Sequence, residues 1–112
     1  IMSNRLFKVQ DLLHKEIAML LHTSVQNPEI KSVTISGVRV SKDLKYSEIY
    51  FTTLQKNYKK VELDLNKASS FIRSQLAKKI HLKRLPSLKF TYDLTAENSQ
   101  KIEKLIKSFP EN

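Results

Sequence analysis

Apolar residues recur along this 112-residue chain with two different spacings, and the order of those spacings limits the folds that the chain can adopt. Over residues 4–25 they recur every three or four positions, which is typical of a helix with one buried face. Two segments rich in β-branched residues follow, 33–40 and 46–54, and polar residues 41–45 separate them. This pattern predicts one amphipathic helix and then two antiparallel strands joined by a turn.

Helical spacing returns over residues 58–80, where two serines interrupt it. Serine favours helix N-termini over helix interiors, so we expect a break or kink at Ala68-Ser69-Ser70. Apolar and polar residues then alternate over 88–92, which predicts a third strand.

A last helix is expected after Asp93, with Thr95 as its N-cap and a buried face that contains Ile102, Leu105, Ile106 and Phe109. We expect Asn27-Pro28 to end the first helix in a turn. The resulting order, α-β-β-α-α-β-α, predicts a single α+β domain over residues 1–112, with helices on one face of a three-stranded sheet. Gly37 lies inside the first strand, where a missing side chain indicates either a bulge or a helix close above the sheet.

Composition excludes several classes of site. Because the chain has no cysteine, it has no disulfides, thiolate zinc sites, iron–sulfur clusters or cysteine nucleophiles. A single glycine excludes the glycine-rich loops that bind nucleotide phosphates. We therefore expect no cofactor, and a cytoplasmic protein that is neither secreted nor membrane-spanning. Ile1, which precedes Met2, is expected to be a residue left by expression cloning.

Positive charge is concentrated in one part of the chain. The net charge is +9, and residues 56–89 carry ten of the 20 basic side chains but only two of the 11 acidic ones. Such a block is the electrostatic footprint expected for binding a phosphate backbone. A solvated lysine-rich surface is the alternative, which the excess of 16 lysines over four arginines favours to some extent.

The residues expected to contact RNA are basic side chains in the second half of the block. They are Arg73, Lys78, Lys79, Lys83 and Arg84. On a continuous helix Arg73 points away from Lys78, so its alternative role is an internal ion pair with an acidic neighbour. A second, weaker group lies upstream, where solvated surface is the better interpretation: Lys56, Lys59, Lys60 and Lys67.

Other chemistry-bearing side chains are given structural interpretations. Ser41 and Asp43 lack a positioned histidine base, so a turn with local hydrogen bonds is favoured over a nucleophile. The histidines, which are His14, His22 and His81, are too scattered to predict a metal site. The spacing of the aromatic residues favours core positions for them, and Tyr58, next to several lysines, is the one candidate for stacking on an RNA base.

An ordered set of short motifs resembles the bacterial ribosome-binding factor A family from Arg5 to Ile106. The motifs are Lys8-Val9, Lys15-Glu16-Ile17, Asn27-Pro28, Val38, Val40-Ser41-Lys42-Asp43-Leu44, Ile49-Tyr50, Ala68-Ser69-Ser70-Phe71-Ile72-Arg73, Leu82-Lys83, Leu85-Pro86 and Leu88-Lys89-Phe90-Thr91-Tyr92-Asp93. No single motif is specific, but their order is.

The resemblance implies a type II KH-like fold, in which an interhelical kink marked by Ala-x-Gly replaces the usual GXXG loop. In this chain Ser70 stands in place of that glycine, and a serine is available to cap the following helix. The resemblance also implies a non-enzymatic factor that binds the small (30S) ribosomal subunit and its 16S rRNA during late, cold-sensitive maturation, including processing of the rRNA 5′ end. Its implied partners include other assembly factors, a GTPase among them, and we expect a monomer.

Two further classes of function remain as alternatives. A generic basic domain that binds RNA or DNA would share the salt dependence but show no preference for ribosomal particles. A nuclease would need carboxylates around metal ions, whereas the basic block contains only Glu62 and Asp64. Attachment to an anionic membrane is disfavoured, because the polar faces of the helices are not uniformly basic.

Overall fold

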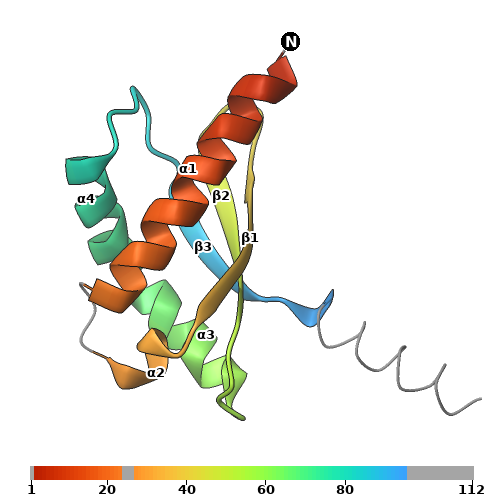
Figure 1. Ribbon diagram of the computed structural model, residues 1–112, viewed down its shortest axis with the longest axis vertical. Coiled ribbons are helices and arrows are strands. Elements are labelled where there is room, and N and C mark those ends of the chain that lie inside the picture. Colours follow the sequence, from red (N-terminus) through yellow and green to blue (C-terminus); the bar gives the residue numbers. More distant parts are fainter. Residues whose placement is uncertain (1, 24–26, 96–112) are drawn as a thin grey trace, which may run out of the picture.

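The computed structural model describes residues 2–23 and 27–95, in which helices pack on one sheet (Figure 1). In chain order the elements are α1 (Met2–Thr23), α2 (Pro28–Lys31), β1 (Thr34–Val40), β2 (Tyr46–Thr52), α3 (Tyr58–Lys67), α4 (Ser69–Lys79) and β3 (Ser87–Tyr92). The predicted α+β class and three-stranded sheet are confirmed. The order is consistent with the KH-like fold that the resemblance implies.

The sheet has the order β1-β2-β3, with β1 antiparallel to β2 and β2 parallel to β3. The register between β1 and β2 shifts between Ile35 and Gly37, which leaves Ser36 as the extra residue of a β-bulge. A Cβ atom added at Gly37 would meet no described atom within 4 Å, so none of the helices in residues 2–23 and 27–95 lies close above this residue. Of the two interpretations of Gly37, the bulge is confirmed.

The core lies between the inner face of the sheet and the helices. Helix α1 packs against β1, whereas α3 and α4 pack against β3 (Figure 1). The fully buried side chains come from both layers and include Leu13, Ile17, Ile49, Phe51, Leu65, Ile72, Leu76 and Phe90. Alternate residues of the strands form the opposite face, which is mostly polar.

The break predicted inside the long helical segment is confirmed at Ala68. Helix α3 ends at Lys67 and α4 begins at Ser69, while the Ala68 carbonyl still accepts a hydrogen bond of 2.9 Å from the Ile72 N–H. The expectation that a serine caps α4 was wrong, because Ala68 occupies the N-cap and makes no side-chain bond. The backbone of Ala68, with φ −87° and ψ −2°, turns the chain without help from a cap.

Helix starts differ from the prediction at two other places. Where only a turn was expected, Asn27 accepts a hydrogen bond of 2.9 Å from the Glu29 N–H and, together with Pro28, starts the short helix α2. After β3, Leu94 and Thr95 are already helical, and Asp93 Oδ1 accepts a bond of 2.9 Å from the Thr95 N–H. Asp93, rather than Thr95, is therefore the capping residue. The predicted buried face of the last helix lies outside the described residues.

Helix side chains form hydrogen bonds with the backbone at both outer edges of the sheet. At the β1 edge, Gln10 of α1 accepts a hydrogen bond of 3.0 Å from the Val40 N–H. At the β3 edge, Asn66 of α3 pairs with both backbone groups of Phe90, at 2.8 and 2.9 Å, and Glu62 accepts from the Tyr92 N–H at 2.8 Å. Helix α3 therefore supplies the partners that a fourth strand would otherwise provide.

We predict that Asn66→Ala lowers the free energy of unfolding by about 2 kcal/mol, because it leaves two partly buried backbone groups without partners. Chemical denaturation measures this loss. Ser70→Ala is the matched control, since Ser70 is exposed and the N-cap of α4 is Ala68, so its effect should stay within about 0.5 kcal/mol. An equal loss in both variants would contradict the edge-closing role of Asn66.

Candidate nucleic-acid interface

The turn between β1 and β2 holds Leu44 in a left-handed backbone conformation. The φ angle of Leu44 is 62°, which is unfavourable for a residue with a branched side chain. Asp43 Oδ1 accepts hydrogen bonds from the Ser41 hydroxyl at 2.7 Å and from the Lys45 N–H at 3.1 Å. The Ser41 hydroxyl in turn accepts from the Tyr46 N–H at 3.0 Å. The structural interpretation of Ser41 and Asp43 is therefore confirmed.

The loop between α4 and β3 is held by Arg73. Its Nε donates to the Pro86 carbonyl at 3.1 Å and its Nη2 donates to the Leu85 carbonyl at 2.6 Å. These bonds fix the end of the loop that carries Lys83 and Arg84. Arg73 therefore has internal partners, as the alternative interpretation expected, but these partners are backbone carbonyls and not an acidic side chain. Contact between Arg73 and RNA stays a prediction.

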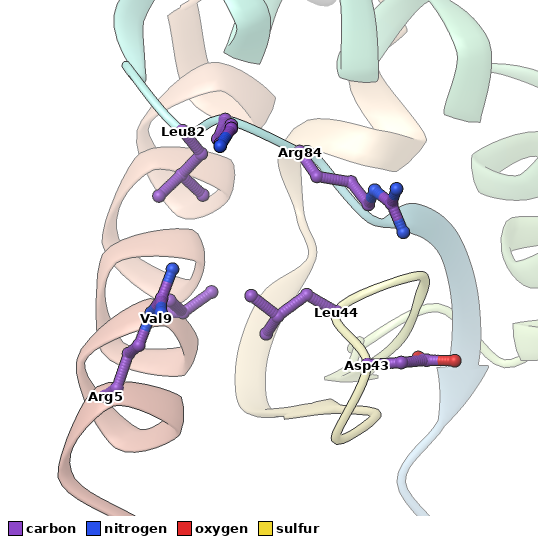
Figure 2. A pocket seen from close by; sticks show the side chains of 7 residues that line it. Arg5, Val9, Asp43, Leu44, Leu82 and Arg84 are labelled. Atoms are coloured by element: carbon purple, nitrogen blue, oxygen red, sulfur yellow. The ribbon is translucent and has the colours of Figure 1, made fainter. Parts of the chain in front are cut away.

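A cleft of about 450 Å³ opens where α1, the β1–β2 turn and the α4–β3 loop meet. Its lining residues are Arg5, Val9, Asp43, Leu44, Leu82, Lys83 and Arg84. Figure 2 shows that Leu44 points toward Val9 on α1, and that Leu82 points into the same space from the loop. Three segments distant in the sequence therefore build one cleft with an apolar centre and basic residues around it.

Four of the predicted RNA-binding residues lie at this end of the fold. Lys78 and Lys79 are exposed in the last turn of α4, and Lys83 and Arg84 are exposed in the loop that follows. Arg5, which the sequence analysis did not select, adds a fifth cation from α1. We call this set the basic end: Arg5, Lys78, Lys79, Lys83 and Arg84. Arg5 lies outside the basic block, but it is the first residue of the family resemblance, and that signal could have identified it.

The structure does not bring Lys60 and Lys67 to the basic end. Lys60 forms an ion pair of 3.6 Å with Glu29 of α2, at the end of the fold opposite the cleft (Figure 1). Lys67 is exposed at the end of α3, and the eleven residues of α4, a length of roughly 16 Å, separate it from the α4–β3 loop. These two lysines belong to a different part of the surface.

The aromatic residues of the described chain differ widely in exposure. Tyr58 is half-buried and stacks on Tyr92, with ring centroids 4.0 Å apart and planes 18° apart. A neighbour distant in the sequence covers one face of the Tyr58 ring, which agrees with the structural interpretation that the spacing favoured. Among the described residues, Phe7, Tyr46 and Phe71 are the most exposed rings, at 71%, 65% and 49%.

Carboxylates balance the positive charge on the outer face of the sheet. Glu48 lies between Arg39 and Lys89 in the strand register. It accepts hydrogen bonds from the Tyr50 hydroxyl and, at 3.0 Å, from the Thr91 hydroxyl. The bond from Tyr50 is the main cause that lowers the pKa of Glu48, against an opposing effect of burial, and the same bond raises the pKa of Tyr50. This ionised carboxylate makes the sheet face a poorer surface for phosphates than the basic end.

Two other kinds of site were searched for among residues 2–23 and 27–95. No group of three or more histidine and acidic side chains there is placed to hold a metal ion. No helix in the same ranges is long and apolar enough to cross a membrane.

We predict that Arg73→Lys loosens the α4–β3 loop, because a lysine cannot reach both carbonyls as the planar guanidinium does. Amide hydrogen exchange over residues 82–85 should accelerate, and the free energy of unfolding should fall by about 1 kcal/mol. Lys78→Arg, a neighbouring change that also keeps the charge, should alter neither quantity. An unchanged rate of amide hydrogen exchange in the Arg73 variant would show that the order of the loop does not depend on the two hydrogen bonds from the guanidinium.

We predict that the β1–β2 turn contributes less stability in acid. Hydrogen bonds from the Ser41 hydroxyl and the Lys45 N–H lower the pKa of Asp43, so ionised Asp43 stabilises the folded state. This contribution is complete above the unfolded pKa of about 3.9 and is lost as pH falls through the lower folded value. Thermal unfolding of wild type and Asp43→Asn should therefore differ most above pH 4 and converge below it. A constant difference would contradict the assignment.

Comparison with known proteins relates this architecture to one family. A family model for ribosome-binding factor A matches residues 5–106. Ribosome-binding factor A of Nitrosomonas europaea is 38% identical over 105 residues, which cover 92% of this chain and 90% of that protein. The crystal structure of ribosome-binding factor A from Thermus thermophilus superposes with a TM-score of 0.71 at 22% identity, over 78% of this chain and 94% of that one.

A further likeness is to a Thermus thermophilus ribosome-binding factor A homology model that was fitted into the cryo-EM map of a 30S–RbfA complex. It has a TM-score of 0.66 at 22% identity and covers 77% of this chain and 92% of that one. The structural likenesses show a shared fold. The family match over most of the sequence, together with the identity to the Nitrosomonas protein, shows that the chain belongs to the ribosome-binding factor A family.

Proposed function

We propose that the protein is a non-enzymatic assembly factor that binds the small (30S) ribosomal subunit and its 16S rRNA during late maturation. The observation that carries this proposal is the basic end: exposed Arg5, Lys83 and Arg84 line one cleft, and exposed Lys78 and Lys79 lie in the last turn of α4, just before the loop that carries Lys83 and Arg84. Among the described residues, the one carboxylate that lines the cleft belongs to Asp43. Family membership and the 30S complex of the Thermus relative support the choice of ribosomal RNA as the partner.

The basic end suits a phosphate backbone in its chemistry. Lysine and arginine neutralise phosphates without reading base sequence, and each contact releases counterions. If all five cations contact single-stranded phosphates, the logarithm of the binding constant should fall with the logarithm of salt concentration with a slope of about −3.5. Affinity for small subunits should therefore fall steeply with salt.

The proposed mode of action is a shift between conformations of the rRNA. A binder favours one conformation only by its greater affinity for that state, and this requires no catalytic residue. In this proposal the protein acts in the cytoplasm together with other assembly factors, including a GTPase. It favours the rRNA conformation in which other enzymes mature the 5′ end.

We predict that charge reversal at four of the five residues of the basic end, all except Arg5, strongly weakens selective binding to small subunits. Co-sedimentation over a salt series would compare small subunits, large subunits and excess unrelated RNA. Wild type should sediment with small subunits, whereas Lys78→Glu/Lys79→Glu/Lys83→Glu/Arg84→Glu should lose at least tenfold in affinity and show a shallower salt slope.

The matched control reverses four exposed lysines away from the cleft, Lys31→Glu/Lys56→Glu/Lys59→Glu/Lys67→Glu, with the same change in net charge. It should keep most of the affinity. Equal binding of wild type to all three partners would instead favour a generic nucleic-acid-binding domain. Specific cleavage of precursor rRNA by the purified protein with magnesium would refute the non-enzymatic assignment.

A further inference from the structure

We propose that the cleft of the basic end binds a single unstacked nucleotide of RNA, with the base against the half-buried Leu44 and Leu82 and a phosphate at the cations that line the cleft. This inference rests on the proposed function, because it specifies how the same surface recognises RNA. It adds a base-binding site to what would otherwise be phosphate contacts alone.

The first argument is the combination of side chains in the cleft. Binding of a phosphate backbone needs only cations, yet the centre of this cleft is lined by apolar side chains from three segments. Leu44 and Leu82 are half-buried, so part of their apolar surface remains in contact with water. A ligand that covers this surface gains hydrophobic stabilisation in addition to the electrostatic attraction.

The second argument is the conformation of Leu44. Glycine or asparagine would adopt a φ of 62° with less strain, yet a leucine occupies the position. Hydrogen bonds through Asp43 stabilise the turn, and as a result the Leu44 side chain faces Val9 across the cleft (Figure 2). Backbone strain of this kind is concentrated at binding sites, where the side chain has a role that offsets the cost.

The third argument is that a nucleotide matches both the size and the polarity of the site. A volume of about 450 Å³ lies within the usual range of small-molecule pockets. A base has an apolar face, and its attached phosphate is an anion that the basic side chains of Arg5, Lys83 and Arg84 can neutralise. Bases inside a duplex are stacked on both faces, so the cleft selects unpaired nucleotides.

The test is a titration of the full chain followed by NMR of the leucine and valine methyl groups. The probes are the four ribonucleoside 5′-monophosphates, ribose 5-phosphate, inorganic phosphate and a phosphoserine peptide. At least one nucleotide should shift the methyl signals of Leu44 and Leu82, and it should bind about tenfold more tightly than ribose 5-phosphate.

Leu44→Asn is the informative variant, because asparagine tolerates the left-handed backbone while removing the apolar wall without changing charge. It should weaken nucleotide binding about tenfold and leave the thermal unfolding midpoint close to that of wild type. Leu54→Asn is the matched control, since Leu54 is 96% exposed, lies outside the cleft lining and should have no effect on nucleotide binding.

The outcomes separate this inference from the proposed function. Equal binding of ribose 5-phosphate or inorganic phosphate, tighter binding of the phosphopeptide, or no methyl shifts with any nucleotide would overturn the nucleotide site. In each of these cases selective sedimentation of wild type with small subunits would leave the proposed function intact. If the inference is right, Leu44→Asn should also weaken binding to small subunits with an unchanged salt slope, because it removes no cation.

Discussion

Parallel pairing of β2 with β3 is the constraint on which the rest of the structure depends. Two parallel neighbours cannot be joined by a tight turn, so the chain must return along the sheet before β3 begins. Helices α3 and α4 make that return, and because the chain breaks between them at Ala68, each helix has a different structural role. Helix α3 closes the free edge of β3 through Asn66 and Glu62, while α4 directs the following loop toward α1.

The distribution of carboxylates, more than that of cations, distinguishes the surfaces of the protein. On the sheet face Arg39 and Lys89 lie on either side of Glu48, whose ionised form is stabilised by two hydroxyl groups. Among the residues that the structure describes, the only carboxylate lining the cleft belongs to Asp43, which accepts hydrogen bonds within its own turn. Unbalanced positive charge therefore remains at one end of the molecule.

Local patterns in the sequence predicted the features that depend on neighbouring residues. Periodicity indicated the three strands, the long first helix and the broken helical segment, and Gly37 indicated the bulge. Features that depend on distant residues were not predictable in this way. The stacking of Tyr58 on Tyr92 joins parts of the chain that only the folded structure brings together, and so does the cleft that Arg5 and Arg84 both line.

The errors at helix starts have a different origin. Asn27-Pro28 suits both the end of one helix and the start of another, and the pattern alone did not reveal the four-residue helix that follows. Serines near a break suggested a cap, but the break was made by backbone rotation at Ala68. In these two cases residue preferences identified where the chain changes direction. They did not identify the backbone hydrogen bonds and angles that produce the change.

The bulge in β1 has a consequence for how the length of this strand can vary. Ile35 and Val38 are three positions apart, so in a regular strand their side chains would face opposite sides of the sheet. Because Ser36 is an extra residue between them, both Ile35 and Val38 pair with inward-facing residues of β2. Removal of Ser36 would restore regular alternation with the same residues facing inward, at the cost of its bond to Asp93. A deletion between Val38 and Val40 would instead reverse the alternation, so that the core residues on one side of the deletion would face outward. Homologous chains should therefore gain or lose a residue at the bulge more readily than elsewhere in β1.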